Sequence, residues 1–326
     1  METRSKKLTK ARLNKKDEFY TQLKDIEAEL KHYKEHFKNK VVLCNCDDPT
    51  KSNFWKYFSE NFNDLELKKL ISTHFEKDKA SYKLELYKEN GQLKTLKTPF
   101  QGNGDFRSEE VIDVLKEADV VVTNPPFSLF REYIAQLVKY NKKFVVMGNN
   151  NAITYKEIFK LIKENKLKLG FNVNKSMEFQ LPDDYDKWGR VGNEGKKYGR
   201  VPAISWFTNL DIKKQVEDLK LYKTYKGNED YYHRYDNYDA INVDKVKDIP
   251  IDYDGVIGVP ITFLKYYNPE QFEILGLTQG SDDAYKTKKY TKKDYPNANS
   301  LNSRGVIICK GVPKVLYARV LIKRKN

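Results

Sequence analysis

Asp119-Val120-Val121-Val122-Thr123-Asn124-Pro125-Pro126-Phe127 is an apolar run of strand length that stops at two consecutive prolines. Its β-branched residues are typical of a strand buried on both faces of a parallel sheet. Because proline fixes φ and has no N–H group, Pro125 and Pro126 end the strand and make the following loop rigid. An ordinary strand terminator explains the prolines, but not the asparagine before them or the aromatic residue after them.

Strands and helices alternate on both sides of this run. We expect strands at 41–44, 67–75, 119–123 and 143–147, helices at 17–37, from 54 onward, at 106–116 and at 130–140, and a hairpin within 76–97 that turns at Asn90-Gly91. Such alternation is the signature of βαβ units. It predicts an α/β fold with a mostly parallel sheet.

A chain of 326 residues suffices for one large domain and a smaller appendage. Residues 1–16 are expected to form a basic arm that follows a phosphate backbone, or a terminus without a role. The candidate contacts to the nucleic-acid backbone are Lys6, Lys7, Lys10, Arg12, Lys15 and Lys16. Residues 17–170 are the expected core. Residues 171–326 are less regular, and we expect strands at 203–208 and 316–323 to return from this portion to the core.

The chain has 60 Lys and Arg against 46 Asp and Glu, a net charge of +14. Such an excess indicates a polyanionic partner, or alternatively a solvated basic surface. Three cysteines cannot build a disulfide framework, and no long apolar run is present, so we expect a cytoplasmic protein with no membrane partner. Cys44 and Cys46 lack a second pair of metal ligands, so they are interpreted as strand residues, and no metal is expected.

Polar or Gly/Pro clusters occur at three points where strands are expected to end. They are Asp47-Asp48-Pro49, Gly102-Asn103-Gly104-Asp105 and the loop 124–127. Ligands of doubly wound sheets bind beyond the carboxyl ends of the strands. The sequence therefore predicts a ligand site where these clusters meet.

Four stretches carry a family resemblance. They are Lys15-Lys16-Asp17-Glu18-Phe19-Tyr20-Thr21, Cys44-Asn45-Cys46-Asp47-Asp48-Pro49, Gly104-Asp105-Phe106-Arg107-Ser108 and Thr123-Asn124-Pro125-Pro126-Phe127-Ser128-Leu129-Phe130-Arg131-Glu132-Tyr133. The last contains a motif similar to the (Asn/Asp)-Pro-Pro-(Tyr/Phe) loop of amino methyltransferases. Together they resemble the EcoRI-type adenine-specific DNA methyltransferases over most of 15–170 and, more thinly, over 235–264.

This resemblance implies a Rossmann-like class I methyltransferase sheet with helices on both faces and a smaller C-terminal target-recognition portion. It implies a site-specific enzyme that methylates adenine N6 in double-stranded DNA with S-adenosylmethionine, in a restriction-modification, phage or orphan context. A cognate restriction endonuclease acting on the same site without a stable complex, and a monomer on DNA, are further expectations. Because the resemblance weakens after residue 170, it does not assign a recognition sequence.

The expected catalytic residues are Asn124, Pro125, Pro126 and Phe127. Adenine N6 is a poor nucleophile until it becomes tetrahedral, and the Asn124 side-chain oxygen and the Pro125 carbonyl are placed by the resemblance to accept its two hydrogens. Direct transfer needs no His or Cys nucleophile. An adenine in a duplex must first be flipped out and stacked, and the candidates for that stacking are Phe127 and Trp206 or Phe207. A core position is the alternative for one of Trp206 and Phe207.

For the cofactor, the resemblance implies three groups of residues. They are Phe19, Tyr20 and Thr21 at the entry segment, Asp47 or Asp48 near the methionine moiety, and Asp105 with Phe106 at the cofactor adenine. A ribose carboxylate is expected after the second strand, where Glu76 is a guess from position only. A plain turn with a helix cap is the alternative for Gly104-Asp105.

Three other interpretations compete with this one. Methyltransferases with related loops act on RNA or protein amines, and a substrate panel separates them. A non-catalytic nucleic-acid-binding module is disfavoured by the intact Asn124 and Phe127. A Rossmann dehydrogenase is set aside because no Gly-x-Gly-x-x-Gly follows the first strand.

Overall fold

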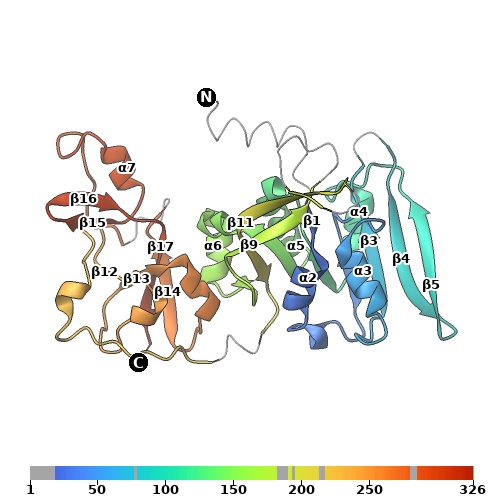
Figure 1. The fold of residues 1–326 in the computed structure, drawn as a ribbon, viewed down its shortest axis with the longest axis horizontal. Helices are drawn as coiled ribbons and strands as arrows, with labels where there is room; N and C mark the ends of the chain where they lie inside the picture. The colour runs from blue at the N-terminus through green and yellow to red at the C-terminus, as the bar shows by residue number, and fades with distance from the viewer. Residues whose placement is uncertain are drawn as a thin grey trace. The chain divides into compact units, whose positions relative to one another are not determined.

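The computed structural model describes residues 19–76, 79–181, 190–192, 195–212, 217–279 and 285–325. They belong to two compact units (Figure 1). The first unit comprises Met1–Ala152 and Leu169–Ile212, and the second comprises Ile153–Lys168 and Lys213–Asn326. The division thus differs from the expected boundary after residue 170, because residues 169–212 return to the first unit.

The first unit is built on a mixed sheet with the strand order β1-β9-β11-β7-β6-β2-β3-β4-β5. Its centre is parallel and consists of β2 (Val41–Cys44), β3 (Lys69–Thr73), β6 (Val120–Thr123) and β7 (Lys143–Asn149). On one side lie the antiparallel strands β1 (Tyr20–Thr21), β9 (Lys175–Gln180) and β11 (Lys197–Thr208), with the short β8 (Lys168–Leu169) and β10 (Arg190–Val191) paired to β11. The four expected central strands are confirmed, and the fold is α/β.

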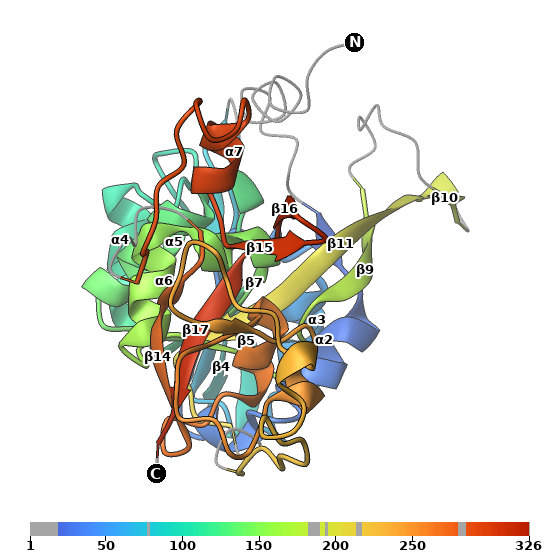
Figure 2. The same ribbon diagram turned by 90° about the vertical axis from the view of Figure 1, so that its left-hand side faces the viewer.

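Helices cover both faces of this sheet. They are α2 (Leu23–Leu30), α3 (Asn53–Glu60), α4 (Glu109–Glu117) and α5 (Phe130–Lys139), with 3-10 turns at Lys34–His36, Phe127–Leu129 and Asn150–Thr154. Figure 2 shows α2 and α3 on one side of the sheet and α4 and α5 on the other. Every residue of β2 and of β6 is buried, as continuous apolar strands between two helical layers require. The Ser52 and Ser108 side chains cap α3 and α4.

The expected helix over 17–37 is wrong at both ends. Tyr20 and Thr21 form β1, which pairs with Gln180 and Phe179 of β9, and the α-helix ends at Leu30. The apolar spacing continues to Phe37 because the 3-10 turn after the helix keeps the same face toward the core. Pairing with a strand 160 residues away along the chain overrides the local pattern at residues 20 and 21.

The expected hairpin is confirmed. Strands β4 (Tyr82–Glu89) and β5 (Gln92–Pro99) pair antiparallel, with Glu89 opposite Gln92. Asn90 and Gly91 make the two-residue turn with φ of 52° and 79°, the left-handed pair that a type I′ turn requires. The hairpin extends the sheet beyond β3, and β5 is its exposed edge.

The second unit contains a separate four-stranded sheet of order β12-β13-β17-β14. Its strands are β12 (Ile241–Asn242), β13 (Ile257–Pro260), β14 (Phe272–Leu277) and β17 (Arg319–Arg324), and a two-stranded hairpin is formed by β15 (Val306–Cys309) and β16 (Val312–Val315). Its helices are α6 (Lys156–Lys163) and α7 (Ala298–Asn302), with 3-10 turns at Glu229–Tyr231, Val246–Asp248 and Ile261–Tyr266.

Of the two strands expected to return to the core, the first lies in β11, which pairs with β7 from Ile204 to Thr208. The expectation for the second, at 316–323, is corrected: β17 pairs with β13 and β14 of the second unit. Its apolar run indicates a buried strand, but a strand's partner depends on which edge is available in three dimensions. A local pattern does not report that edge.

Candidate active site

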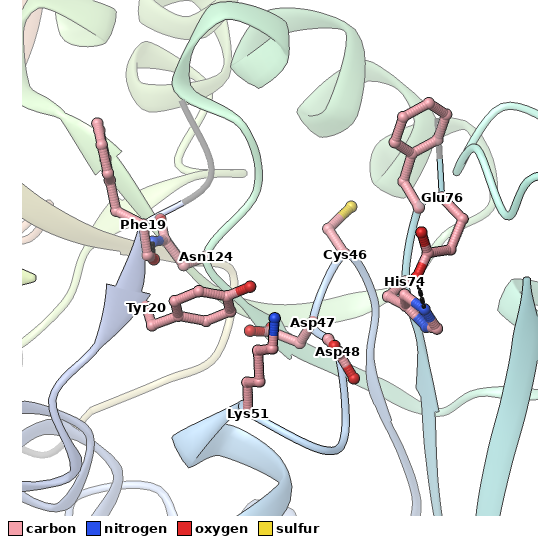
Figure 3. A pocket seen from close by; sticks show the side chains of 10 residues that line it. Phe19, Tyr20, Cys46, Asp47, Asp48, Lys51, His74, Glu76 and Asn124 are labelled. Carbon is pink, nitrogen blue, oxygen red and sulfur yellow. Dashed lines mark hydrogen bonds and ion pairs between the residues drawn. The ribbon is translucent and has the colours of Figure 1, made fainter. Parts of the chain in front are cut away.

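A pocket opens at the carboxyl ends of the parallel strands of the first unit (Figure 3). It is lined by Phe19, Tyr20, Cys46, Asp47, Asp48, Lys51, His74, Phe75, Glu76 and Asn124. These residues come from the segment leading into β1, the turn after β2, the segment after β3 and the loop after β6. Two of the three predicted clusters therefore meet at one pocket, and the third, 102–105, does not line it.

Asn124 is a pocket residue with a hydrogen-bond acceptor that has no partner. Its side chain is buried, and its Nδ2 donates a hydrogen bond to the Phe19 carbonyl at 2.8 Å, which orients the amide. Among the described residues, no donor reaches its Oδ1. A buried acceptor without a partner is costly, and such atoms in native proteins point to a missing ligand or water. Asn124 Oδ1 is thus an unused acceptor on a residue that lines the pocket.

The rest of the loop is held close to the sheet. Pro125 and Pro126 are buried, and the Pro126 carbonyl accepts a hydrogen bond from the Leu129 N–H at 2.9 Å. Phe127 is half-buried, with its ring 6.2 Å from that of Phe19 and 6.3 Å from that of Phe179. The aromatic position of the loop therefore packs beside a pocket residue.

Asp47 lines the pocket and is hydrogen-bonded to the start of the loop after β6. Its carboxylate accepts hydrogen bonds from the Thr123 hydroxyl, the Ser52 hydroxyl at 3.1 Å and the Asn124 backbone N–H. Burial raises the pKa of Asp47 to about 7, although these hydrogen bonds oppose the rise. Asp47 thus joins the turn after β2, the start of α3 and the loop after β6.

This raised pKa predicts a pH-dependent stability. Because the folded-state pKa of Asp47 lies above its unfolded value near 4, the protonated form favours folding, and stability falls as the pH rises from about 4 to about 7. The loss of unfolding free energy over this pH range is on the order of 4 kcal/mol, at roughly 1.4 kcal/mol per pH unit. The neutral Asp47→Asn variant lacks this component. Urea unfolding of both proteins at pH 4.5 and pH 8 measures it, and equal pH slopes in the two proteins would contradict the assignment.

Asp48, Lys51 and Glu76 supply opposite charges around the pocket. Asp48 accepts two hydrogen bonds from Thr50 through one carboxylate oxygen, Oδ1. Glu76 lies 3.2 Å from the His74 ring nitrogen. In Figure 3 the side chains of Tyr20, Lys51 and Asp47 lie beside Asn124, Glu76 and His74 lie together on the other side, and Asp48 lies between the two groups. The pocket can thus pair with a ligand that carries both signs of charge and hydroxyl groups.

Three predicted cofactor residues do not line the pocket. Thr21 is buried and its hydroxyl donates to the Met147 sulfur. Asp105 forms a bidentate ion pair with Arg107, whose Nη2 is 2.7 Å away, and Phe106 is buried against Tyr133. The turn before Asp105 nevertheless adjoins the pocket, because the Asn103 carbonyl accepts the Glu76 N–H at 2.8 Å.

Gly104 makes that contact possible. Its φ is +75°, and a Cβ added there would overlap the His74 carbonyl oxygen and crowd the Ser81 side chain. Gly104→Ala is expected to move the turn away from His74 and to cost about 2 kcal/mol or more of stability from the positive φ and the clash together. Ligand affinity of the pocket should fall with it. Gly91→Ala, which also has a positive φ but open space around its Cβ, is the control; equal losses in both would rule out the crowding.

The proposed stacking role of Trp206 and Phe207 needs correction. Both rings are fully buried, with Trp206 against Phe54 and Phe207 against Phe130. Helices cover both faces of β11 at this point, so neither of these successive side chains reaches the surface. Neither ring offers a free face to a base in this structure.

Cys46, Lys51, His74 and Phe75 line the pocket but were not predicted to bind the ligand. Cys46 lies in the turn after β2, with φ of 64°, and not in the strand as expected. His74 and Phe75 directly follow β3, just before Glu76. The rule that ligands meet strand ends could have found these residues, because all but Lys51 lie within two residues of one.

The remaining expectations concern the basic arm, a metal site and a membrane span. Lys6, Lys7, Lys10, Arg12, Lys15 and Lys16 lie outside the described residues. In the described part of the chain no three His, Cys, Asp or Glu side chains come together as a metal site. No helix there is long and apolar enough to cross a membrane.

Comparison of the whole chain with known proteins identifies its family. Residues 7–325 match the family model described as adenine-specific methyltransferase EcoRI. The chain is 50% identical over 297 residues to type II methyltransferase M.EcoRI of Escherichia coli, covering 86% of this chain and 91% of that protein. It is 42% identical over 325 residues to type II methyltransferase M.MpnI of Mycoplasma pneumoniae, covering 97% and 98%. No solved structure matches. The chain therefore belongs to the EcoRI-type family of adenine-specific methyltransferases.

Proposed function

We propose that this adenine-specific methyltransferase transfers the methyl group of S-adenosylmethionine to N6 of a flipped adenine in double-stranded DNA, at a specific site and within a restriction-modification system or as an orphan or phage enzyme. The observation that carries the proposal is the buried Oδ1 of Asn124, which accepts no hydrogen bond from the described residues and lies in a pocket at the strand ends. An exocyclic amine can donate the hydrogen bond that this oxygen lacks.

The chain's own groups favour the reacting geometry of the amine. Asn124 Oδ1 and the Pro125 carbonyl accept the two N6 hydrogens, and this pulls the nitrogen toward the tetrahedral form in which its lone pair is free. The Phe19 carbonyl keeps the amide of Asn124 from rotating. Asp47 holds the backbone N–H of the same residue. Geometry set before binding costs no reorganisation during the reaction.

The pocket fits the proposed cofactor by its donor set. Bound S-adenosylmethionine supplies an electrophilic methyl group on a sulfonium. In our assignment Asp48 and Lys51 bind the ammonium and carboxylate of its methionine moiety, and Glu76 accepts the ribose hydroxyls. Phe19 and Tyr20 line the same pocket. In the same assignment Asp105 and Phe106 contact the cofactor adenine, which requires the Asp105–Arg107 ion pair to open.

The remaining assignments concern the DNA and the fold. The parallel centre of the sheet, with helices on both faces and the antiparallel β11 beside β7, supports a Rossmann-like class I arrangement. Phe127 is our stacking platform for the flipped base, since its ring is half-buried beside the pocket. We propose that residues 171–326 contribute target recognition and that the enzyme acts as a monomer, without a stable complex with any cognate nuclease.

The direct test is transfer of labelled methyl from S-adenosylmethionine to unmethylated double-stranded DNA, followed by digestion to nucleosides. We expect the label in N6-methyldeoxyadenosine. RNA and protein acceptors are offered in parallel under the same conditions. Binding of the cofactor with no transfer to DNA would refute the DNA assignment, and label in RNA or protein would identify the acceptor instead.

A further inference from the structure

The hairpin β15–β16 of the second unit is short and tightly turned. Its register pairs Val306 with Val315 and Cys309 with Val312. Lys310 and Gly311 form the two-residue turn with φ of 51° and 76°. This is the left-handed pair of a type I′ turn, whose twist matches that of the strands. The hairpin is therefore a regular β-ribbon up to its last residue.

The root of this ribbon is packed on both faces. On one face Val306 is buried with Tyr290 and Leu301, and Val315 packs against the same cluster. On the other face Ile307 is buried with Tyr235 and Tyr238, and Cys309 packs against them. Figure 1 shows the ribbon beside α7. Packing on both faces holds the ribbon in one orientation within the second unit.

The tip differs from the root in burial, because it exposes apolar side chains that take no part in the packing of the root. Ile308 is 38% exposed and Val312 is 63% exposed, and the register places them on opposite faces of the ribbon. Lys310 in the turn and Lys314, opposite Ile307, are exposed, and Tyr317, two residues after β16, is 81% exposed. Exposed apolar residues gathered on a rigid projection mark a contact surface.

The stretch of sequence that contains this tip is strongly basic. Residues 285–318 contain eight cationic side chains, Lys286, Lys288, Lys289, Lys292, Lys293, Arg304, Lys310 and Lys314, against the single acid Asp294. Acids from outside this stretch also contribute, since Asp236 pairs with Lys288 at 2.8 Å and Asp244 lies close enough to Lys314 to interact with its charge. A surface with this excess repels basic partners and attracts a polyanion.

We propose that the β15–β16 tip is a DNA-reading element that enters a groove of the duplex. The major groove, about 12 Å wide, admits a two-stranded β-ribbon. Lys310 and Lys314 then contact phosphates, and Ile308 and Val312 contact apolar groups of the groove such as thymine methyls. This inference rests on the proposed function, because it gives that function its duplex contact.

The chain contains a matched control in the β4–β5 hairpin of the first unit. That hairpin has the same two-residue turn type and also exposes two apolar residues, Leu93 at 41% and Leu96 at 47%, together with Lys88. It differs in its charge surroundings, because Glu85 and Glu89 lie on the same ribbon and pair with lysines. Equal substitutions in the two hairpins separate a specific contact from a general loss of surface charge.

The test compares I308S/K310Q/V312S with the control L93S/K88Q/L96S by fluorescence anisotropy. The probe is a labelled duplex containing a sequence that the wild-type enzyme methylates. We expect the Kd of the β15–β16 variant to rise at least tenfold, with a shallower salt dependence by about one ion for the lost lysine. The Kd of the control variant is expected to stay within about twofold, and both variants keep cofactor affinity.

Lys310→Glu alone serves as a second variant, because a single exposed turn residue does not disturb the packed root; a several-fold higher Kd is expected. Unchanged Kd values for this variant and for the triple variant overturn the hairpin proposal, as do equal losses in the control. In these cases a wild-type enzyme that still methylates duplex DNA leaves the proposed function standing. If instead the wild-type enzyme labels no duplex DNA, the proposed function itself has failed.

Discussion

Asn124→Ala is expected to lower the methyl-transfer rate by about a hundredfold to a thousandfold while cofactor affinity changes little. The substitution removes the Oδ1 acceptor, and loss of one preorganised group that acts on the transition state typically costs this much in rate. Asn124 also donates to the Phe19 carbonyl, so that wall of the pocket loses one hydrogen bond. Single-turnover transfer with saturating cofactor and DNA measures the rate apart from binding.

Two further variants make this prediction specific. Asn124→Asp keeps a side-chain acceptor but loses the donor to Phe19, so its rate is expected to lie between those of the wild type and the alanine variant. Asn149→Ala changes an asparagine at the end of β7, outside the pocket, and is expected to leave the rate within about threefold. Equal rates for Asn124→Ala and the wild type would remove this residue from the reaction.

Glu29→Ala is expected to cost about 4 kcal/mol of unfolding free energy, the largest loss that we expect from a single substitution. The Glu29 carboxylate is fully buried and accepts hydrogen bonds from the backbone N–H groups of Phe171 and Asn172, each at 2.7 Å. It also accepts the Tyr33 hydroxyl at 2.8 Å. Each buried donor left without a partner costs roughly 1–3 kcal/mol. Burial raises the pKa of Glu29, and the hydrogen bonds from Asn172 and Phe171 oppose that rise.

Loss of Glu29 is expected to destabilise the sheet as well, because Glu29 on α2 holds the segment that leads into β9. Urea unfolding of Glu29→Ala, with Glu27→Ala on the exposed face of the same helix as control, measures the difference. Glu27→Ala is expected to change stability by less than about 0.5 kcal/mol. Tyr33→Phe removes one donor only and should cost about 1 kcal/mol. A loss below about 1 kcal/mol in Glu29→Ala, less than a single unpaired donor costs, would show that the loop does not depend on this carboxylate.

The local structure of the loop 124–127 could be predicted from the sequence. Consecutive β-branched residues predicted a buried strand, and two prolines predicted a rigid loop after it, because both effects act within a few residues. The strand-end rule also predicted that Asp47 and Asn124 would lie near each other. It succeeded for these two clusters because the carboxyl ends of parallel strands meet at one edge, whereas the third cluster, 102–105, does not line the pocket.

Features that depend on long-range pairing were decided only in three dimensions. Trp206 and Phe207 are aromatic, as residues that stack on bases are. Their burial, however, depends on the helices that cover β11. β1 and β17 were misjudged because each takes its partner from a distant segment. The partnerless oxygen of Asn124 is likewise a property of everything around it. Periodicity and residue type report how a segment is built, but only the packed structure determines which surfaces and hydrogen-bonding atoms remain available to a ligand.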